Sequence, residues 1–165
     1  IQNLVNQNYE VIYNDDDKGE AADVIAIKTE TTGNDIKLII ELYHCKFSSS
    51  SSPGNRLDDL YVVCGQAQRS AHFREDPIRL LRHLLRRNPI RRNGQEFSRY
   101  EVGDKNTLLA ITQMAYQAEV IMKVFIVQPG VSISGLTEEQ NKLLAVTDNY
   151  LMETYQLPFY AILSA

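Results

Sequence analysis

The sequence has few of the features that mark secreted, membrane-spanning or nucleotide-hydrolysing proteins. Only two of its 165 residues are cysteines, which argues against a disulfide scaffold and is compatible with a reducing cytosol. No stretch is long and apolar enough to span a bilayer, and no signal peptide is visible. A phosphate-binding glycine loop and a G-x-S-x-G motif are also absent, which disfavours nucleotide hydrolysis and serine-hydrolase chemistry.

A strongly basic composition is absent as well, since the net charge is -4 at pH 7. This average argues against a generic basic nucleic-acid binder. The charge is nevertheless unevenly distributed along the chain. Residues 1–24 hold six acidic residues and one lysine, whereas residues 74–92 hold seven arginines, one glutamate and one aspartate. The sequence therefore contains an acidic cluster and a separate basic cluster.

The chain does have enough apolar sequence for one core. With 165 residues and 44% hydrophobic content, it is long enough for a single domain over residues 1–165 and too short for two comfortable ones. It begins with isoleucine rather than methionine, so we expect a domain of a larger protein. The only low-complexity stretch is the serine run 48–52, followed by Pro53 and Gly54, which predicts a flexible loop tip.

The pattern of apolar and polar residues predicts an α/β fold. Strands are expected at 9–13, 23–28, 36–47 and 157–163, and at 119–127, where Pro129 and Gly130 should end the strand. Helical spacing predicts helices at 57–73, 77–88, 104–117 and 137–155, the last opened by a capping box of Thr137 and Gln140. The resulting order, βββαααβαβ, is typical of a mixed central sheet flanked by helices.

The third predicted strand ends in "YHCK", which presents two polar side chains on one face. Because side chains alternate along a strand, His44 and Lys46 point to the same side. Asp23 stands at the start of the preceding strand, and in an antiparallel pair joined by a turn this position lies near the end of the next strand. We therefore expect Asp23, His44 and Lys46 to meet at one edge of the sheet.

Such a group has the residue types that metal-dependent phosphodiester cleavage requires. A hard divalent cation binds oxygen ligands, and a positive side chain steadies the attacked phosphate. At this point the sequence resembles the PD-(D/E)xK nuclease superfamily, the fold of restriction endonucleases. The resemblance rests on "GEAAD" opening a strand, on "YHCK" ending the next, and on "CGQAQ" in the following helix. It covers residues 9–73, with 119–127 as a fourth core strand.

The resemblance implies a restriction endonuclease-like αβββαβ core. In that core an aspartate and a second acidic residue bind Mg²⁺, and a lysine two positions after the second acid assists attack. Asp23 matches the motif aspartate and Lys46 matches its lysine.

The sequence departs from this pattern at His44, where the superfamily has Glu or Asp. Glu41 is a poor substitute, because its odd offset from Lys46 puts it on the opposite face of the strand. Imidazole can bind a divalent cation, with more preference for Mn²⁺ over Mg²⁺ than a carboxylate has. Glu20, three residues before Asp23, is a further candidate ligand. The expected cofactor is thus Mg²⁺ or Mn²⁺ held by Asp23, His44 and Glu20, and the alternative is a degenerate site that binds DNA without cutting it.

Two glutamines follow on the predicted helix 57–73. In some members of the superfamily a glutamine on this helix reaches the active site, and Gln66 and Gln68 are both available here. Helical spacing places Gln68 in the apolar stripe of Leu57, Tyr61 and Cys64, so we expect Gln68 to face the sheet and Gln66 to lie nearly opposite. A buried glutamine needs hydrogen-bond partners, which a metal site or a crowded helix interface would supply equally.

The basic cluster lies on the predicted helix 77–88 and just beyond it. Arg79, Arg82 and Arg86 share one helical face, and guanidinium groups suit bidentate contact with phosphate. A solvated charged face and an interface to a neighbouring domain are the two alternatives. The arginines expected to bind DNA are Arg79, Arg82, Arg86, Arg87, Arg91 and Arg92.

The segments "HCKFSS" and "DDLYVVCGQAQRS" resemble the nuclease-type domains attached to superfamily 2 helicases in bacterial restriction and phage-defence proteins. This resemblance implies a metal-dependent DNA nuclease domain in a prokaryotic cytoplasm. It also implies a helicase or ATPase domain in the same polypeptide or complex, and no membrane partner. The second hypothesis is a non-enzymatic module of the same fold that binds DNA or docks onto a helicase through the arginine helix.

Overall fold

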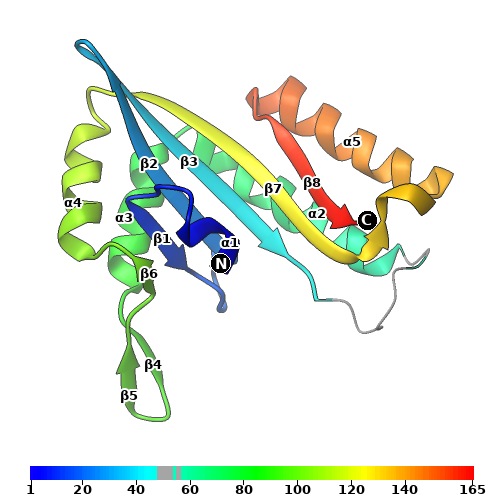
Figure 1. The fold of residues 1–165 in the computed structure, drawn as a ribbon, viewed down its shortest axis with the longest axis horizontal. Helices are drawn as coiled ribbons and strands as arrows, with labels where there is room; N and C mark the ends of the chain where they lie inside the picture. Colours follow the sequence, from blue (N-terminus) through cyan, green and yellow to red (C-terminus); the bar gives the residue numbers. More distant parts are fainter. Residues whose placement is uncertain (48–53, 55–56) are drawn as a thin grey trace.

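The computed structural model of this chain describes residues 1–47, 54 and 57–165, and its centre is a mixed sheet of six strands (Figure 1). The strand order is β6-β1-β2-β3-β7-β8. Neighbours from β6 to β3 pair antiparallel, whereas β3, β7 and β8 are parallel to one another. The strands are β1 (Val11–Asn14), β2 (Val24–Thr32), β3 (Asp35–Cys45), β6 (Tyr100–Val102), β7 (Glu119–Ser132) and β8 (Phe159–Ser164).

Two of the longer helices begin where the sequence supplies a capping side chain. The Asp76 side chain accepts a hydrogen bond from the Arg79 N–H with Pro77 in the first turn, and Thr137 and Gln140 form the expected capping box. None of the helices formed by the described residues combines the length and apolar character that a membrane span needs. The helices are α1 (Gln2–Val5), α2 (Asp58–Ser70), η1 (Ala71–Arg74), α3 (Pro77–Arg87), α4 (Lys105–Met114), η2 (Ile133–Gly135) and α5 (Glu138–Tyr155).

The main core lies between the sheet and helices α2 to α5. Ile25, Ile40 and Val124 from the strands pack in one buried cluster with Leu60 of α2 and Leu151 of α5. The α/β fold with a mixed sheet flanked by helices, predicted from the hydrophobic pattern, is therefore confirmed. Burial of this apolar surface supplies the main stabilisation of the fold.

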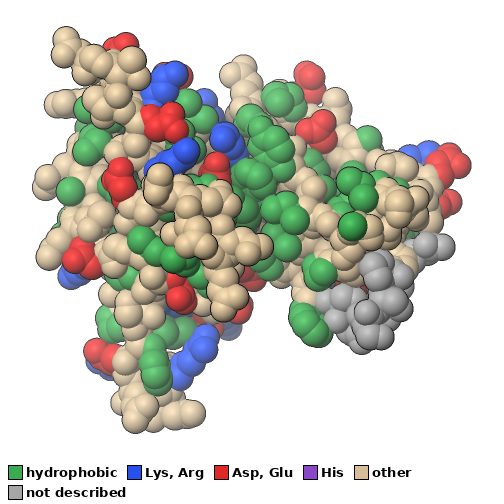
Figure 2. All heavy atoms as spheres, in the orientation of Figure 1, with side chains coloured by type: hydrophobic (Ala, Val, Ile, Leu, Met, Phe, Trp, Pro, Cys, Tyr) green, Lys and Arg blue, Asp and Glu red, His purple; other side chains and the backbone are tan. Residues whose placement is uncertain are grey.

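The opposite face of the sheet is covered only in part. The short helix α1 lies in front of it in Figure 1, and Leu4 packs on a small second cluster that contains Ile12 and Tyr43. Figure 2 shows hydrophobic side chains running along the middle of this face. There Phe125 stacks between Tyr43 and Tyr160, with ring centroids 4.6 and 4.8 Å apart.

Some predicted boundaries were wrong. Strand β7 continues past Pro129 and Gly130 to Ser132, and its pairing with β8 shifts register between Gln128 and Ser132. A proline lacks the N–H that a ladder needs, and a register shift at that point accommodates it. The short strands β4 (Ile90–Arg92), β5 (Gln95–Phe97) and β6 were not predicted. The serine run 48–52 lies outside the described residues.

Candidate active site

The loop between β1 and β2, residues 15–23, carries the acidic side chains of the site. Its ends are joined, since the Asp15 N–H donates to the Asp23 carbonyl oxygen at 3.0 Å. A turn closes its middle, where the Glu20 N–H donates to the Asp17 carbonyl oxygen at 3.0 Å. Gly19 has a φ of 82° in this turn, which glycine adopts without steric cost. Backbone hydrogen bonds thus hold the loop in a compact conformation.

Asp15 fastens this loop to the rest of the fold. Its side chain is fully buried and accepts hydrogen bonds from the Ala21 N–H at 2.8 Å and from the Arg87 Nε. Arg87 also donates to the Lys18 carbonyl oxygen at 3.1 Å. Arg99 is 4% exposed and donates to the Asn14 carbonyl oxygen, also at 3.1 Å. The guanidinium of Arg87 is therefore engaged by the loop, which removes it from the group expected to bind phosphate.

Three carboxylates of the loop gather into an acidic group. One side-chain oxygen each of Asp16, Glu20 and Asp23 lies within 4.8 Å of the other two. Burial raises the pKa of Glu20, and the charges of Asp23 and Asp16 raise it further. Burial also raises the pKa of Asp23. Oxygen ligands at this spacing suit a hard divalent cation such as Mg²⁺ or Mn²⁺, which would relieve the repulsion between the carboxylates.

Asp23 meets the end of β3, as antiparallel pairing predicts. Its carboxylate accepts a hydrogen bond from the Cys45 N–H at 2.7 Å. Lys46 follows directly, and its own N–H donates to the Val127 carbonyl oxygen at 3.0 Å. Burial raises the pKa of Asp23, and the positive charge of Lys46 acts against that rise. Asp23 and Lys46 are therefore electrostatic neighbours.

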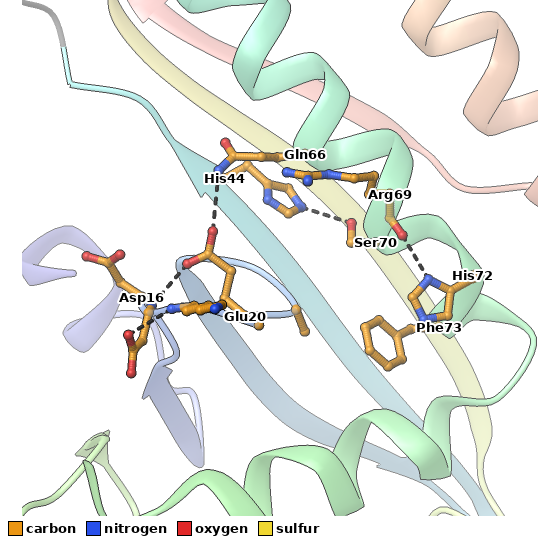
Figure 3. A pocket seen from close by; sticks show the side chains of 12 residues that line it. Asp16, Glu20, His44, Gln66, Arg69, Ser70, His72 and Phe73 are labelled. Atoms are coloured by element: carbon orange, nitrogen blue, oxygen red, sulfur yellow. Dashed lines mark hydrogen bonds between the residues drawn. The ribbon is translucent and has the colours of Figure 1, made fainter. Parts of the chain in front are cut away.

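A cavity of about 550 Å³ opens beside the acidic group (Figure 3). Its walls come from residues 16–21 of the loop, from His44 of β3, and from α2 and η1. Gln66 reaches across from α2, and its Nε2 donates to Glu20 Oε1 at 3.3 Å. Neither Asp23 nor Lys46 is part of the lining, but Asp23 adjoins it through Asp16 and Glu20.

His44 lines the cavity but does not join the acidic group. Its side chain is 2% exposed, and its Nε2 lies 2.9 Å from Ser70 Oγ. Because the Ser70 hydroxyl donates to the Ala67 carbonyl oxygen at 2.9 Å, Ser70 Oγ is an acceptor for His44. His44 therefore carries its proton on Nε2 and keeps a lone pair on Nδ1, which has no partner among the described residues. Burial, followed by the charge of Arg69, lowers the pKa of His44 to about 4, so the ring is neutral.

Of the three residues expected to bind the cation, the structure brings two together and keeps one apart. Asp23 and Glu20 come together, whereas His44 is held by Ser70 and stays outside their group. Asp16 is the third member of the acidic group, and the sequence did not predict it. The "DDDKGE" run gave the signal for an acidic turn, but alternation rules do not say which side chain of a loop points to a partner.

The two glutamines of α2 point in other directions than helical spacing predicted. Gln66 contacts the acidic group, whereas Gln68 Nε2 donates to Thr147 Oγ1 of α5 at 3.3 Å. Gln68 thus faces α5 rather than the sheet, and of the two alternatives for its partners the structure shows the helix interface. The stripe of Leu57, Tyr61, Cys64 and Gln68 lines a groove between α2 and α5.

Glu41 lies on the other face of the sheet, as its offset from Lys46 predicts. Its carboxylate accepts hydrogen bonds from the Tyr9 hydroxyl and from the Tyr43 hydroxyl, the latter at 2.7 Å. Lys123 Nζ lies 3.3 Å from its other oxygen. The pairing of β3 with β2 and β7 shows no register shift, so no bulge turns Glu41 toward the acidic group.

The other arginines expected to bind phosphate differ in their exposure and in their contacts. Arg79, Arg82 and Arg86 are exposed on α3, and Arg82 Nη2 donates to the Tyr116 hydroxyl at 2.8 Å. Arg91 pairs with Glu96, with Nη2 2.7 Å from the carboxylate. Arg69 lines the cavity and adds a positive charge to it. It follows Gln66 by three residues, a spacing that puts both on one side of a helix.

Comparisons with protein families, with curated proteins and with solved structures each found no significant match to this chain. Its function is therefore argued from the site, because fold class alone does not determine chemistry. The mixed α/β class is compatible with many activities. The features that narrow the possible activities are the acidic group, the cavity beside it and the basic residues Lys18 and Arg69 in the cavity lining.

Adding Mn²⁺ should raise the melting temperature of the protein. A cation that binds only the folded state at a hundredfold excess over its Kd adds about 2.7 kcal/mol of stability. Thermal denaturation with Mn²⁺ and with EDTA measures this gain, which Asp23→Asn should reduce. Asp35→Asn, at an exposed position of β3 far from the acidic group, is the matched control and should keep the full gain. An equal gain in all three proteins would place the cation elsewhere.

Proposed function

We propose that this chain is a metal-dependent DNA nuclease domain that hydrolyses phosphodiester bonds. The observation that carries the proposal is the convergence of Asp16, Glu20 and Asp23 at the point where Asp23 meets the end of β3 and Lys46. Divalent cations held by carboxylates, with a lysine nearby, are suited to binding and hydrolysing a phosphodiester. The cofactor we propose is Mg²⁺ or Mn²⁺.

The order of the elements supports a restriction endonuclease-like core. A helix, three antiparallel strands, a helix and a strand parallel to the third occur here as α1, β1 to β3, α2 and β7. This is the αβββαβ order that the sequence resemblance implies. The segment from α3 to α4 is inserted between α2 and β7.

Each side chain of the site has a role in this proposal. Asp16, Glu20 and Asp23 would hold the cation, which when bound supplies positive charge to the phosphate and lowers the pKa of a water molecule. Lys46 steadies the negative charge that builds up on the phosphate during attack. Gln66 fixes the orientation of the Glu20 carboxylate through their hydrogen bond.

His44 has a separate role as a neutral group of the cavity wall. Its Nε2–H is taken by Ser70, so its Nδ1 can accept a hydrogen bond from a water molecule or from the substrate. Because burial keeps its pKa at about 4, this role does not change between pH 6 and pH 8.

The proposed partner is DNA, bound through exposed arginines. Arg79, Arg82 and Arg86 of α3 offer phosphate contacts on the helix whose last residue, Arg87, anchors the acidic loop. A helicase or ATPase domain in the same polypeptide or complex, and a prokaryotic cytoplasm, are further parts of the proposal that rest on the sequence resemblance.

Incubation with supercoiled plasmid and with linear DNA in Mg²⁺ or Mn²⁺ tests the proposal. Wild type should cut, and Lys46→Ala and Asp23→Ala should each slow cleavage by about a hundredfold or more. Lys37→Ala is the matched control, because Lys37 lies on the same strand as the motif but at its far end, next to Glu119. Cleavage that survives both substitutions at the site would reject the assignment of Asp23 and Lys46.

One observation favours a second candidate function, a DNA-binding module that does not cut. His44 stands where the superfamily has a carboxylate, and Ser70 holds it away from the acidic group. Salt-sensitive DNA binding without cleavage in either metal would support this second candidate. The arginine surface of α3 would then serve DNA binding or helicase docking alone.

A further inference from the structure

A β-hairpin projects from the body of the protein between α3 and β6 (Figure 1). Strands β4 and β5 pair antiparallel, and Asn93 and Gly94 connect them with φ values of 50° and 79°. Two left-handed residues of this kind form the tight type I′ turn of β-hairpins. All residues from 91 to 98 are exposed, and Figure 2 shows charged side chains of both signs on this projection. The hairpin is thus a solvent-exposed arm with a narrow tip.

The base of this arm is fastened to the acidic loop. On its entry side, Arg87 donates to the Asp15 carboxylate and to the Lys18 carbonyl oxygen. On its exit side, Arg99 donates to the Asn14 carbonyl oxygen and lies 3.2 Å from the Asp17 carboxylate. The two sides are joined, because the Asn88 side chain accepts the Arg99 N–H at 2.9 Å. These contacts fix the base of the arm relative to the loop that carries Asp16, Glu20 and Asp23.

The two faces of the hairpin differ in what they can bind. Arg91 lies opposite Glu96 on one face, where the two side chains form an ion pair. Arg92 lies opposite Gln95 on the other face, together with Ile90 and Phe97. Arg92 has no ion-pair partner within the part of the chain that the structure describes. One face is therefore neutralised internally, and the other offers a guanidinium next to an amide.

We propose that this hairpin enters the major groove of duplex DNA and presents Arg92 and Gln95 to base edges. The inference rests on the proposed function and names its substrate class as double-stranded DNA. The major groove admits a two-stranded β-ribbon, and the bidentate donors and acceptors of Arg and Gln match guanine and adenine there. Arg79, Arg82 and Arg86 are exposed on α3, the helix that leads into the hairpin, and would complement the phosphates that flank the groove.

Binding to a labelled 20-bp duplex and to a 20-nucleotide single strand, measured by fluorescence anisotropy in EDTA, tests this inference. The variant Arg92→Ala/Gln95→Ala of the full chain should bind the duplex about tenfold more weakly and the single strand as wild type does. Arg92→Lys should give an intermediate loss, since it keeps the charge but not the bidentate geometry. Arg91→Ala is the matched control, because it removes one charge from the same hairpin on the face that Glu96 already occupies. It should change duplex affinity by less than about threefold.

Three results would overturn the inference. They are an unchanged duplex affinity in the double variant, an equal loss in Arg91→Ala, and an equal loss for the single strand. Thermal melting of each variant shows whether it is folded. Because binding is measured without a divalent cation, a failure of DNA cleavage would leave the hairpin result standing. Conversely, normal metal-dependent cleavage by a variant with no binding defect would reject the hairpin alone.

Discussion

Replacing Asp15 by alanine should destabilise the protein by about 3–5 kcal/mol. Asp15 is fully buried, accepts hydrogen bonds from Ala21 and Arg87, and lies 3.8 Å from the guanidinium of Arg99. Its removal leaves Arg99, which is 4% exposed, with only the exposed carboxylate of Asp17 as an ion-pair partner. A buried charge that loses its buried partner keeps its desolvation cost and loses much of its compensation. Equilibrium unfolding in urea at neutral pH measures the loss.

Asp16→Ala is the control for this substitution. It removes the same side chain one residue further along, where the carboxylate is exposed, and should change stability by no more than about 0.5 kcal/mol. Adding Arg99→Met to Asp15→Ala should recover part of the loss, because it removes the buried charge that Asp15 no longer neutralises. A stability of Asp15→Ala equal to that of Asp16→Ala would show that the buried ion network does not hold the loop in place.

The protein should also lose stability as the pH falls from about 6.5 to about 4, through the buried His44 ring. The unfolded chain takes up a proton on this histidine near its ordinary pKa of 6.5, whereas burial delays the uptake in the folded chain to about 4. The unfolded state therefore binds more protons in this window, and stability declines as pH falls. The contribution is complete above the upper limit, and the loss reaches about 3 kcal/mol at the lower one.

The difference in unfolding free energy between wild type and His44→Gln isolates this effect. Glu20 and Asp23 have raised pKa values, so they act with the opposite sign, but both proteins contain them and their contribution cancels. The difference should shift in favour of the variant as pH falls through the window. A difference that does not vary with pH would mean that His44 is protonated as easily in the folded chain as in the unfolded one.

The sequence predicts most of the fold because local signals and burial agree along most of the chain. The cap at Asp76 with Pro77, and the capping box of Thr137 and Gln140, fix the starts of α3 and α5. Alternation along β3 separates His44 from Glu41, and the structure shows them on opposite faces of the sheet. The meeting of Asp23 with the end of β3 follows from antiparallel pairing alone.

The parts that sequence did not predict depend on contacts between distant segments. Asp15 and Asp16 are adjacent and alike, yet one is buried in an ion network with Arg99 and the other joins the acidic group. Only the fold, which brings residue 99 to the loop, distinguishes them. The predicted orientation of Gln68 was wrong because α2 packs against α5 as well as against the sheet. A single apolar stripe on a helix does not show which of two neighbouring elements a side chain contacts.

The hairpin of β4 and β5 was not predicted for a different reason. Its strands have three residues each, and "IRRNGQEF" lacks the alternation of apolar and polar residues that marks a strand packed on a core. The Asn93-Gly94 pair is the local signal that could have identified it, since this dipeptide favours the tight turn seen here. The arginines that precede this pair instead favoured an interpretation of the segment as a phosphate-binding helix and its C-terminal end.

The Mn²⁺ dependence of DNA cleavage by wild type and by Asp16→Asn tests the central claim most directly. Asp16 belongs to the acidic group by structure alone, and no sequence motif points to it. If the group holds the catalytic cation, loss of one of its three carboxylates should raise the Mn²⁺ concentration for half-maximal rate by about tenfold, and excess Mn²⁺ should restore the rate. Asp35→Asn should match wild type. Cleavage in EDTA, no cleavage by wild type at any Mn²⁺ concentration, or the same Mn²⁺ dependence in Asp16→Asn and wild type would contradict the claim.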